Sequence, residues 1–228
     1  MNLAIIPARK GSKRLPNKNL LDLAGKPLIK HTIDAALKSS VDDVVVSTDC
    51  EVIRNIAIKA GAKVLELRPD YLSNDVASTI DVLRFEMEKY ESLVGPVDEI
   101  TLLQPTSPLR NNIHIDEAIN LFRSNDAEIV VSVCPNEHPA DWNLSLGKGN
   151  LIDTTNLRNA RRSQDYPTSY RLNGAIYCIG SSYLKETESI LSSSKSYAYV
   201  MSPGTSVDID TLFDFKVASL LLSDINKC

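Results

Sequence analysis

The chain opens with MNLAIIPARKGSKRLPNKNL (residues 1–20), in which a short apolar run is followed at once by a basic loop. Residues 3–7 have the length and apolar character of a buried β-strand. The positive charges that follow lie within ten residues around one glycine: Arg9, Lys10, Lys13, Arg14 and Lys18. Because open parallel sheets bind ligands at the carboxyl ends of their strands, this loop is placed to bind an anion if the strand belongs to such a sheet.

Apolar runs of strand length then alternate with helical patterns as far as residue 134. The further strand patterns span residues 44–47, 63–66, 100–103 and 129–134, and the helical patterns span residues 28–38, 52–60, 78–90 and 113–122. Runs such as VVVS and IVVSV are typical of strands covered on both faces. Strands that alternate with helices indicate βαβ units, so we expect an α/β fold with a mostly parallel sheet.

This alternation stops at residues 135–172, which are polar and contain four arginines. A segment of this length without clear elements is usually functional or interacting rather than a plain linker. Regular patterns resume at residues 174–179 and 197–201 and in a closing helix at about residues 211–222. We therefore predict a single domain over residues 1–228, with residues 135–172 inserted within it.

Composition narrows the choice of partner and compartment. The 228 residues are 43% hydrophobic with a net charge of −4, which argues against nucleic acid or an anionic membrane as the main partner. No apolar run approaches the ~20 residues that span a bilayer. The four cysteines are widely spaced, as in a reduced protein: Cys50, Cys134, Cys178 and Cys228. We expect a cytoplasmic location.

The first loop contains the groups that bind phosphate. Gly11 permits a tight turn whose backbone N–H groups point at phosphate oxygens. Arg9, Lys13 and Lys18 add charge-assisted hydrogen bonds, which suit a triphosphate. Neither the Walker motif nor the three-glycine dinucleotide fingerprint is present. The alternative is a solvated surface loop, and the charge cluster alone does not decide between the two.

Two carboxylates near the C-terminus have a spacing that suits a cation. Asp208 and Asp210 point to the same side if their segment is extended. Mg²⁺ commonly binds through one or two carboxylates together with substrate phosphates. The alternative is that Asp210 caps the helix that begins near Thr211, and spacing alone leaves both interpretations open.

The motif LLQPTSPLR (residues 102–110) places polar groups directly after an apolar strand. Pro105 and Pro108 stiffen the turn, so that Gln104 and its neighbours are held rigidly. The alternative is a proline-stiffened turn whose hydroxyl groups bond their own backbone.

These stretches together resemble the sugar-acid cytidylyltransferases, in particular the CMP-sialic acid synthetase branch. The sequence IIPARKGSKRLPNKNL (residues 5–20) is similar to the N-terminal signature of that family. Further similar blocks follow in the family's order: STD (47–49), LRPDYLSNDVAS (67–78), LLQPTSPLR (102–110), NGAIY (173–177) and SVDID (206–210). They cover nearly the whole chain except residues 135–170. The resemblance implies a Rossmann-like three-layer sandwich of the nucleotide-diphospho-sugar transferase type.

The resemblance also implies roles for individual residues. Nucleotide binding is implied for Ala8, Arg9, Gly11, Ser12, Lys18, Asn19, Arg68 and Ser73. Binding of the sugar acid is implied for Gln104, Thr106, Ser107, Arg171 and Asn173. Asp208 and Asp210 would bind Mg²⁺ or Mn²⁺. The residues expected to act in catalysis are Arg9, Lys18, Asp208 and Asp210.

The implied reaction is CTP plus N-acetylneuraminate giving CMP-sialate and pyrophosphate. Legionaminic acid and ketodeoxyoctonate are alternative acceptors, although Gln104 stands where relatives that use ketodeoxyoctonate carry an acidic residue. A glycosyltransferase with an Asp-x-Asp metal site and a non-catalytic nucleotide-binding protein are more distant alternatives. Residues 135–172 correspond to the family's dimerisation segment, so we expect a homodimer with one of three arginines near the neighbour's pocket: Arg158, Arg161 or Arg162.

Overall fold

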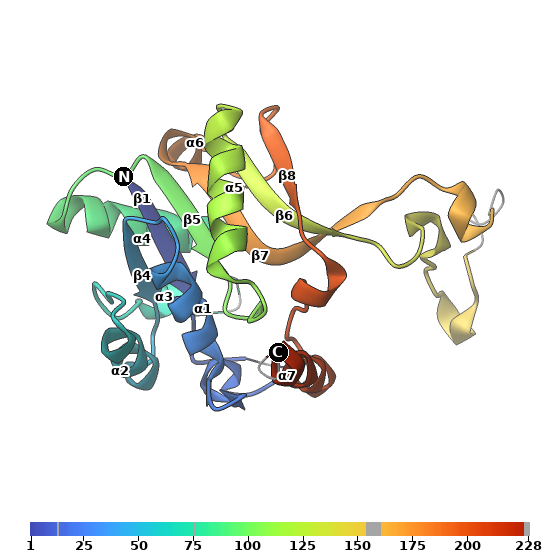
Figure 1. The fold of residues 1–228 in the computed structure, drawn as a ribbon, viewed down its shortest axis with the longest axis horizontal. Coiled ribbons are helices and arrows are strands. Elements are labelled where there is room, and N and C mark those ends of the chain that lie inside the picture. The colour runs from blue at the N-terminus through green and yellow to red at the C-terminus, as the bar shows by residue number, and fades with distance from the viewer. Residues whose placement is uncertain (13, 75, 154–160, 226–228) are drawn as a thin grey trace.

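The computed structural model describes residues 1–12, 14–74, 76–153 and 161–225, with a six-stranded sheet at the centre (Figure 1). The strand order across the sheet is β4-β1-β5-β7-β6-β8. The bounds are β1 Asn2–Pro7, β4 Asp43–Ser47, β5 Glu99–Leu103, β6 Ile129–Pro135, β7 Tyr170–Gly180 and β8 Ser196–Val200. Within this sheet only β7 is antiparallel to its neighbours, which confirms the mostly parallel α/β fold.

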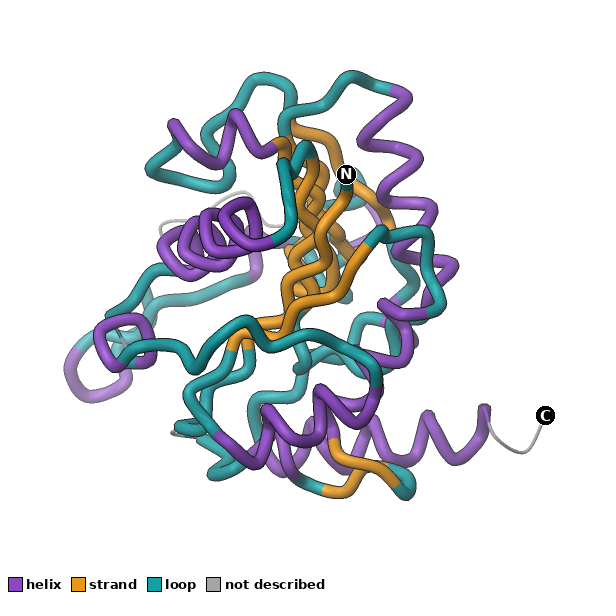
Figure 2. The backbone as a smooth tube through the Cα atoms, turned by 90° about the vertical axis from the view of Figure 1, so that its left-hand side faces the viewer, coloured by secondary structure: helices purple, strands orange, loops and turns teal. Residues whose placement is uncertain are grey.

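Side chains of each strand enter two separate cores. In β1, Ala4 and Ile6 pack on one side of the sheet, whereas Leu3 and Ile5 pack on the other. The helices on the first side are α1 (Leu28–Leu37), α2 (Glu51–Ala60) and α5 (Asn112–Ser124), and those on the second are α4 (Thr79–Leu93) and α6 (Ser181–Glu186). Figure 2 shows helices on both sides of the strands. The three-layer sandwich is confirmed, and burial on both faces explains the unbroken apolar runs.

The predicted strand at residues 63–66 is wrong. Only Lys63 pairs with the sheet, as a single parallel bridge to Val45. The apolar residues that produced the strand pattern, Val64 and Leu65, instead pack against the edges of the two cores. Burial against a sheet edge gives the same sequence signal as pairing within the sheet, so the pattern could not distinguish them.

The remaining predicted elements are present, with ends shifted by a few residues. Elements too short for a periodic pattern were not predicted, among them the hairpin of β2 (Asp22–Leu23) and β3 (Lys26–Pro27) and the helices α3 (Asp70–Ser73) and α6. The closing helix is α7 (Leu212–Ile225). None of the helices in the described part of the chain has the length and apolar character needed to cross a membrane.

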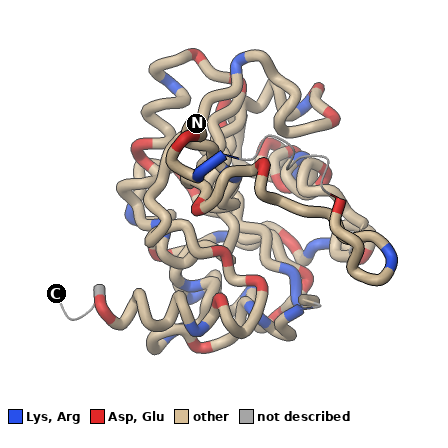
Figure 3. Tube along the Cα trace, turned by 90° about the vertical axis from the view of Figure 1, so that its right-hand side faces the viewer, with Lys and Arg blue, Asp and Glu red and all other residues tan. Residues whose placement is uncertain are grey.

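The chain between β6 and β7 forms an arm that extends away from the sheet (Figure 1). The strands end at Pro135 and resume at Tyr170, so the arm comprises residues 136–169, slightly less than the predicted segment. It contains the short 3-10 helices η2 (Ala140–Trp142), η3 (Lys148–Asn150) and η5 (Ser163–Asp165). Figure 3 shows acidic and basic residues interspersed along the chain on this side. A role of the arm in dimerisation stays a prediction.

Candidate active site

The sequence motifs meet at one edge of the sheet. Since β1, β4 and β5 are parallel, their carboxyl ends lie together, and the antiparallel β7 begins at the same edge. The Ala8 N–H donates to Ser47 O at 2.8 Å, which ties the start of the basic loop to the end of β4. The loop and the STD and LLQPTSPLR motifs therefore surround one region, as expected for the ligand edge of an open sheet.

A cavity of about 330 Å³ lies between the basic loop and the 206–210 segment. We call it the basic cavity. Its lining residues are Pro7, Arg9, Gly11, Ser12, Arg14, Lys18, Asn19, Gln104, Pro105, Thr106 and Asp210. Most of the residues predicted from the sequence to bind the nucleotide are thus brought together with Gln104 and Asp210. Arg14 also lines this cavity, although the sequence reasoning noted it only as part of the charge cluster.

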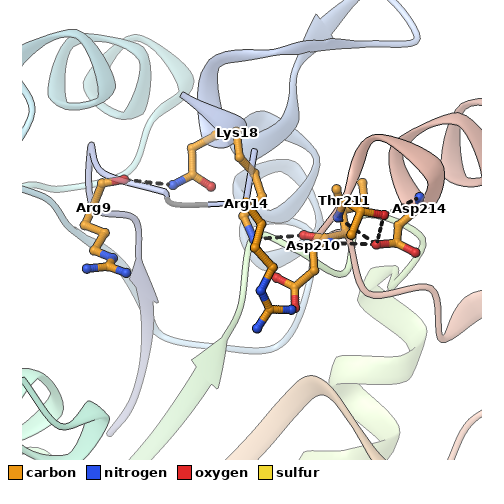
Figure 4. Close-up of polar contacts among 8 residues, drawn as sticks. Arg9, Arg14, Lys18, Asp210, Thr211 and Asp214 are labelled. Atoms are coloured by element: carbon orange, nitrogen blue, oxygen red, sulfur yellow. Dashed lines mark hydrogen bonds and ion pairs between the residues drawn. The ribbon is translucent and has the colours of Figure 1, made fainter. Parts of the chain in front are cut away.

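Lys18 and Arg14 both contact Asp210 (Figure 4). The Lys18 ammonium donates to Asp210 Oδ1 at 3.1 Å and to Ile209 O at 2.8 Å. An Arg14 guanidinium N–H donates to Asp210 Oδ2 at 2.6 Å. The Lys18 side chain is only 13% exposed, whereas that of Arg14 is 71% exposed. Lys18 is therefore fixed in the wall of the cavity, and Arg14 closes its outer side.

The basic loop is held by polar contacts from neighbouring segments. The Asn19 side chain donates to Arg9 O at 3.1 Å, and Asp49 accepts from the Lys10 N–H at 2.7 Å. Gly11 is not among the described residues in a left-handed conformation, and a Cβ there would meet nothing within 4 Å, so its role in binding phosphate stays a prediction. Among the described residues of the loop, the left-handed position is Asn17, with φ 54°.

Asp210 does not cap the closing helix. The Asp214 N–H donates to Thr211 Oγ1 at 3.3 Å, and the Thr211 N–H donates to Asp214 Oδ2 at 2.7 Å. This reciprocal pair satisfies the start of α7. The carboxylate of Asp210 consequently remains in the basic cavity with Lys18 and Arg14, and the capping alternative is wrong.

Asp208 lines a neighbouring cavity of about 350 Å³, together with Arg171, Ser206 and Asp214. Burial raises the pKa of Asp208 above its usual range, and the negative charge of Asp210 adds to the rise. Asp208 thus lines a different cavity from Asp210, which lines the basic cavity. Within the described residues, no group of three or more His, Cys, Asp or Glu side chains is arranged as a metal site. A cation on this pair would thus need phosphate oxygens as further ligands.

A second cavity of about 230 Å³ adjoins the basic cavity and shares Pro7 and Arg9 with it. Arg68, Asn74, Ala77, Ser78 and Thr79 also line it. Arg68 is 6% exposed and donates to Ser47 O at 3.0 Å. Its burial fixes one wall of this cavity against the end of β4.

A third cavity, which we call the apolar-lined cavity, has a volume of about 370 Å³ and lies on the other side of Gln104. Its lining residues are Ser78, Thr79, Ile80, Leu102, Gln104, Leu172, Tyr177, Ser189, Ile190 and Leu191. Gln104 also lines the basic cavity, and Ser78 and Thr79 also line the second cavity. These three cavities are therefore contiguous around the ends of β1 and β5.

Some predicted site residues do not line the cavities described above. Ala8, Ser107 and Asn173 are buried, and the Ser73 hydroxyl donates to Pro69 O at 3.0 Å. The Asn173 amide donates to Ser206 Oγ at 2.9 Å and accepts from Ser132 Oγ at 2.6 Å. In this structure Asn173 thus connects β7 to the 206–210 segment. Any direct contact of these residues with substrate stays a prediction.

Two of the three predicted arginines of the arm, Arg161 and Arg162, do not line these cavities. The Arg161 N–H donates to the Tyr166 hydroxyl at 2.9 Å, and Arg162 pairs with Asp165 at 3.2 Å. Arg158 and Lys13 lie outside the described residues. Arg171 lines the cavity of Asp208 rather than the apolar-lined cavity that contains Gln104.

Comparison with known proteins gives consistent similarities. The family model for cytidylyltransferases matches residues 3–147. The N-acylneuraminate cytidylyltransferase of Streptococcus agalactiae serotype III is 42% identical over 218 residues, covering 93% of this chain and 51% of that protein. The chain thus spans about half the length of the first curated relatives it matches. The CMP-N,N'-diacetyllegionaminic acid synthase of Legionella pneumophila is 37% identical over 222 residues, covering 96% of this chain and 95% of that protein.

A solved structure of a CMP:2-keto-3-deoxy-manno-octonic acid synthetase complexed with CTP has the same fold. Its TM-score is 0.74 at 20% identity, over 98% of this chain and 99% of that one. The agreement extends over the whole sandwich, as predicted from the sequence.

Proposed function

Because the chain belongs to the cytidylyltransferase family, we propose that it transfers the cytidylyl group of CTP to a nine-carbon 2-keto sugar acid and releases pyrophosphate. The observation that carries this proposal is the contiguity of the basic cavity with two further cavities around Arg9 and Gln104. A nucleotide and a second substrate would then meet at the carboxyl end of β1. N-acetylneuraminate is the first candidate for the acceptor.

The basic cavity suits the triphosphate of CTP. Arg9, Ser12 and Lys18 line it, and their donors would bind phosphate oxygens. Lys18 is the first candidate for the α-phosphate because the carbonyl of Ile209 and the carboxylate of Asp210 hold its ammonium in the cavity wall. The chain would accelerate transfer by aligning the α-phosphorus and offsetting the charge that develops on its oxygens.

The second cavity suits the cytosine ring. Arg68 and the 74–79 segment line it, and Arg9 connects it to the basic cavity. The nucleotide would therefore extend from Arg68 across Arg9 to Lys18.

The apolar-lined cavity favours an N-acylated sugar acid. Leu102, Tyr177 and Ile190 provide apolar surface beside the amide of Gln104. Burial of an acyl methyl group against such a surface is favourable. A sugar acid that has only hydroxyl groups offers no methyl group to bury there. The names of the relatives, which refer to N-acylneuraminate and N,N'-diacetyllegionaminic acid, fit this preference. The cavity supports nonulosonic acids over ketodeoxyoctonate and leaves the two acylated acids as the acceptors to compare.

Asp208 and Asp210 would hold Mg²⁺ or Mn²⁺ together with phosphate oxygens. When bound, the ion would neutralise phosphate charge and make the sugar hydroxyl easier to ionise. The raised pKa of Asp208 fits this role, since a bound cation would favour the ionised form of its carboxyl group.

Replacing Asp208 with asparagine is expected to raise the Mg²⁺ concentration for half-maximal activity by about tenfold or more, because one of two protein ligands is lost. Chelation of Mg²⁺ with EDTA should abolish turnover of the unmodified protein. Asp126→Asn, at a carboxylate whose side chain is 94% exposed, is the matched control and should respond to Mg²⁺ as the unmodified protein does. An unchanged Mg²⁺ requirement in Asp208→Asn would remove this residue from the metal site.

The arm is proposed to pair two copies of the chain. Its exposed apolar side chains are Leu144, Leu146, Leu151 and Ile152, and Trp142 stacks on His138 with ring centroids 5.9 Å apart. Light scattering should give a mass of about twice 25.1 kDa. A monomeric mass at micromolar concentration would argue against the pairing.

The buried, unpaired Cys50, Cys134 and Cys178 agree with the proposed cytoplasmic location.

The test of the proposed function is pyrophosphate release from CTP and Mg²⁺ with three acceptors in parallel. These are N-acetylneuraminate, N,N'-diacetyllegionaminic acid and ketodeoxyoctonate. Turnover is expected with an acylated acid and little with ketodeoxyoctonate. A glycosyltransferase would release no pyrophosphate, and a purely nucleotide-binding protein would bind CTP without turnover. Absence of release with every acceptor, while CTP still binds, would overturn the proposal.

A further inference from the structure

Arg110 is a buried cation without an ionic partner among the described residues. It ends the LLQPTSPLR motif and is 2% exposed. Burial lowers the pKa of its guanidinium to about 9. One guanidinium nitrogen donates to two backbone carbonyls, Gln104 O at 3.1 Å and Ala175 O at 2.8 Å. Burying a charge is unfavourable, and these two carbonyls are the hydrogen-bond partners of the Arg110 side chain among the described residues.

The two carbonyls belong to different strands that border the site. Gln104 directly follows β5, and Ala175 lies within β7. Arg110 therefore bridges the end of β5 to β7 at the edge where the cavities meet. This contact fixes the backbone carbonyl of Gln104.

The side chain of Gln104 lies against Gly174. Gly174 has φ +73°, a left-handed conformation that residues with a Cβ rarely adopt. A Cβ built on Gly174 would lie 2.9 Å from Gln104 Oε1, closer than such contacts allow. Glycine at this position thus allows the Gln104 amide to lie directly against β7.

We propose that Arg110 and Gly174 are positioning residues that hold Gln104 in the wall between the basic cavity and the apolar-lined cavity. Arg110 sets the backbone of Gln104, and Gly174 sets the place of its side-chain amide. The inference rests on the proposed function, in which Gln104 contacts the sugar acid, and it assigns both residues to recognition of that acid rather than of CTP.

Arg110→Met is expected to raise the KM for the sugar acid by about tenfold and to change the KM for CTP by less than about threefold, since roughly one hydrogen bond to the acid is misplaced. Methionine fills a similar volume but removes a donor from the carbonyls of Gln104 and Ala175, so the variant is first shown to be folded by its thermal unfolding. Gly174→Ala should shift the same KM in the same direction. Arg123→Met is the control, because Arg123 pairs with Glu99 at the other end of β5.

A double-mutant cycle tests whether Arg110 acts through Gln104. In a Gln104→Ala background, Arg110→Met should raise the KM for the acid by less than about twofold further. Multiplicative losses of the two changes, or equal increases in both KM values, would overturn the inference.

A measurement without substrate separates this inference from the proposed function. The side-chain amide of Gln104 can be observed by NMR in ¹⁵N-glutamine-labelled protein and assigned by its loss in Gln104→Ala. We expect one well-ordered signal pair that shifts or broadens in Arg110→Met but not in Arg123→Met. An unmoved signal in Arg110→Met contradicts the positioning role, whereas absence of turnover with a moved signal would contradict only the proposed reaction.

Discussion

Lys18→Met is expected to lower kcat/KM for CTP by about a thousandfold, the largest loss predicted for a single side chain in this protein. The ammonium of Lys18 is held by Ile209 O and by Asp210 in the wall of the basic cavity. A preorganised charge in such a position offsets the negative charge that grows on the phosphate during transfer. The measurement is initial rates of pyrophosphate release over a range of CTP concentrations.

The control for this variant is Lys30→Met. Lys30 is also paired with an aspartate, Asp34 at 2.6 Å, but it lies on α1 outside the cavities described above. It should retain activity within about twofold, and both variants should unfold close to the temperature of the unmodified protein. If a folded Lys18→Met retains kcat/KM within about tenfold, Lys18 does not contact the transferring phosphate.

Glu86→Gln is expected to make the protein more stable relative to the unmodified form as the pH rises. Glu86 lies in α4 and its side chain is fully buried. Burial raises its pKa from 4.5 to about 7, and the interaction with the Ser47 hydroxyl and the positive charge of Arg68 oppose the rise only in part. The carboxyl group is therefore a titrating group that glutamine replaces with a neutral one.

The sign of the effect follows from proton linkage. Below pH 4.5 Glu86 is neutral in both states, and its favourable contribution is lost as the pH rises through about 7. At about 1.4 kcal/mol per pKa unit, the loss amounts to about 3 kcal/mol, which corresponds to roughly 5–10 °C in Tm for a chain of this size. The Tm difference between Glu86→Gln and the unmodified protein should therefore increase by this amount between pH 5 and pH 8.

Glu88→Gln is the matched control, since Glu88 lies on the exposed face of the same helix. It should give a Tm difference that is nearly constant with pH. Any constant offset from placing an amide at residue 86 cancels when the two pH values are compared. A Tm difference for Glu86→Gln that does not change with pH would show that this carboxyl group titrates normally.

The sequence was most informative where apolar runs and fixed motifs coincide. The first strand, its basic loop and the acidic 206–210 segment each have a strong local signal, and their order implied one ligand edge. The strand predicted at residues 63–66 failed because Val64 and Leu65 are half-buried against the two cores rather than paired with the sheet. An apolar run in the sequence indicates that its residues are buried, but it does not indicate whether their backbone pairs with a strand.

Long-range partners account for the site residues that the sequence did not assign. Arg14 contacts Asp210 across 196 positions of the chain, and Arg110 contacts Ala175 across 65. Charged residues such as Arg110 and Glu86 are ordinarily assigned to the surface, so their burial is visible only in the assembled fold. In the same way, Asn173 was assigned to the substrate from a motif, and the structure adds its bonds to Ser132 and Ser206.

The most direct test of the central claim is the fate of the α-phosphate of CTP. The chain would be incubated with Mg²⁺, an acylated nonulosonic acid, and CTP labelled with ³²P at either the α or the γ position. The account predicts that the α label co-migrates with a CMP-sugar acid and that the γ label appears as pyrophosphate. Recovery of the α label as free CMP, or only in unreacted CTP, would contradict cytidylyl transfer at this site.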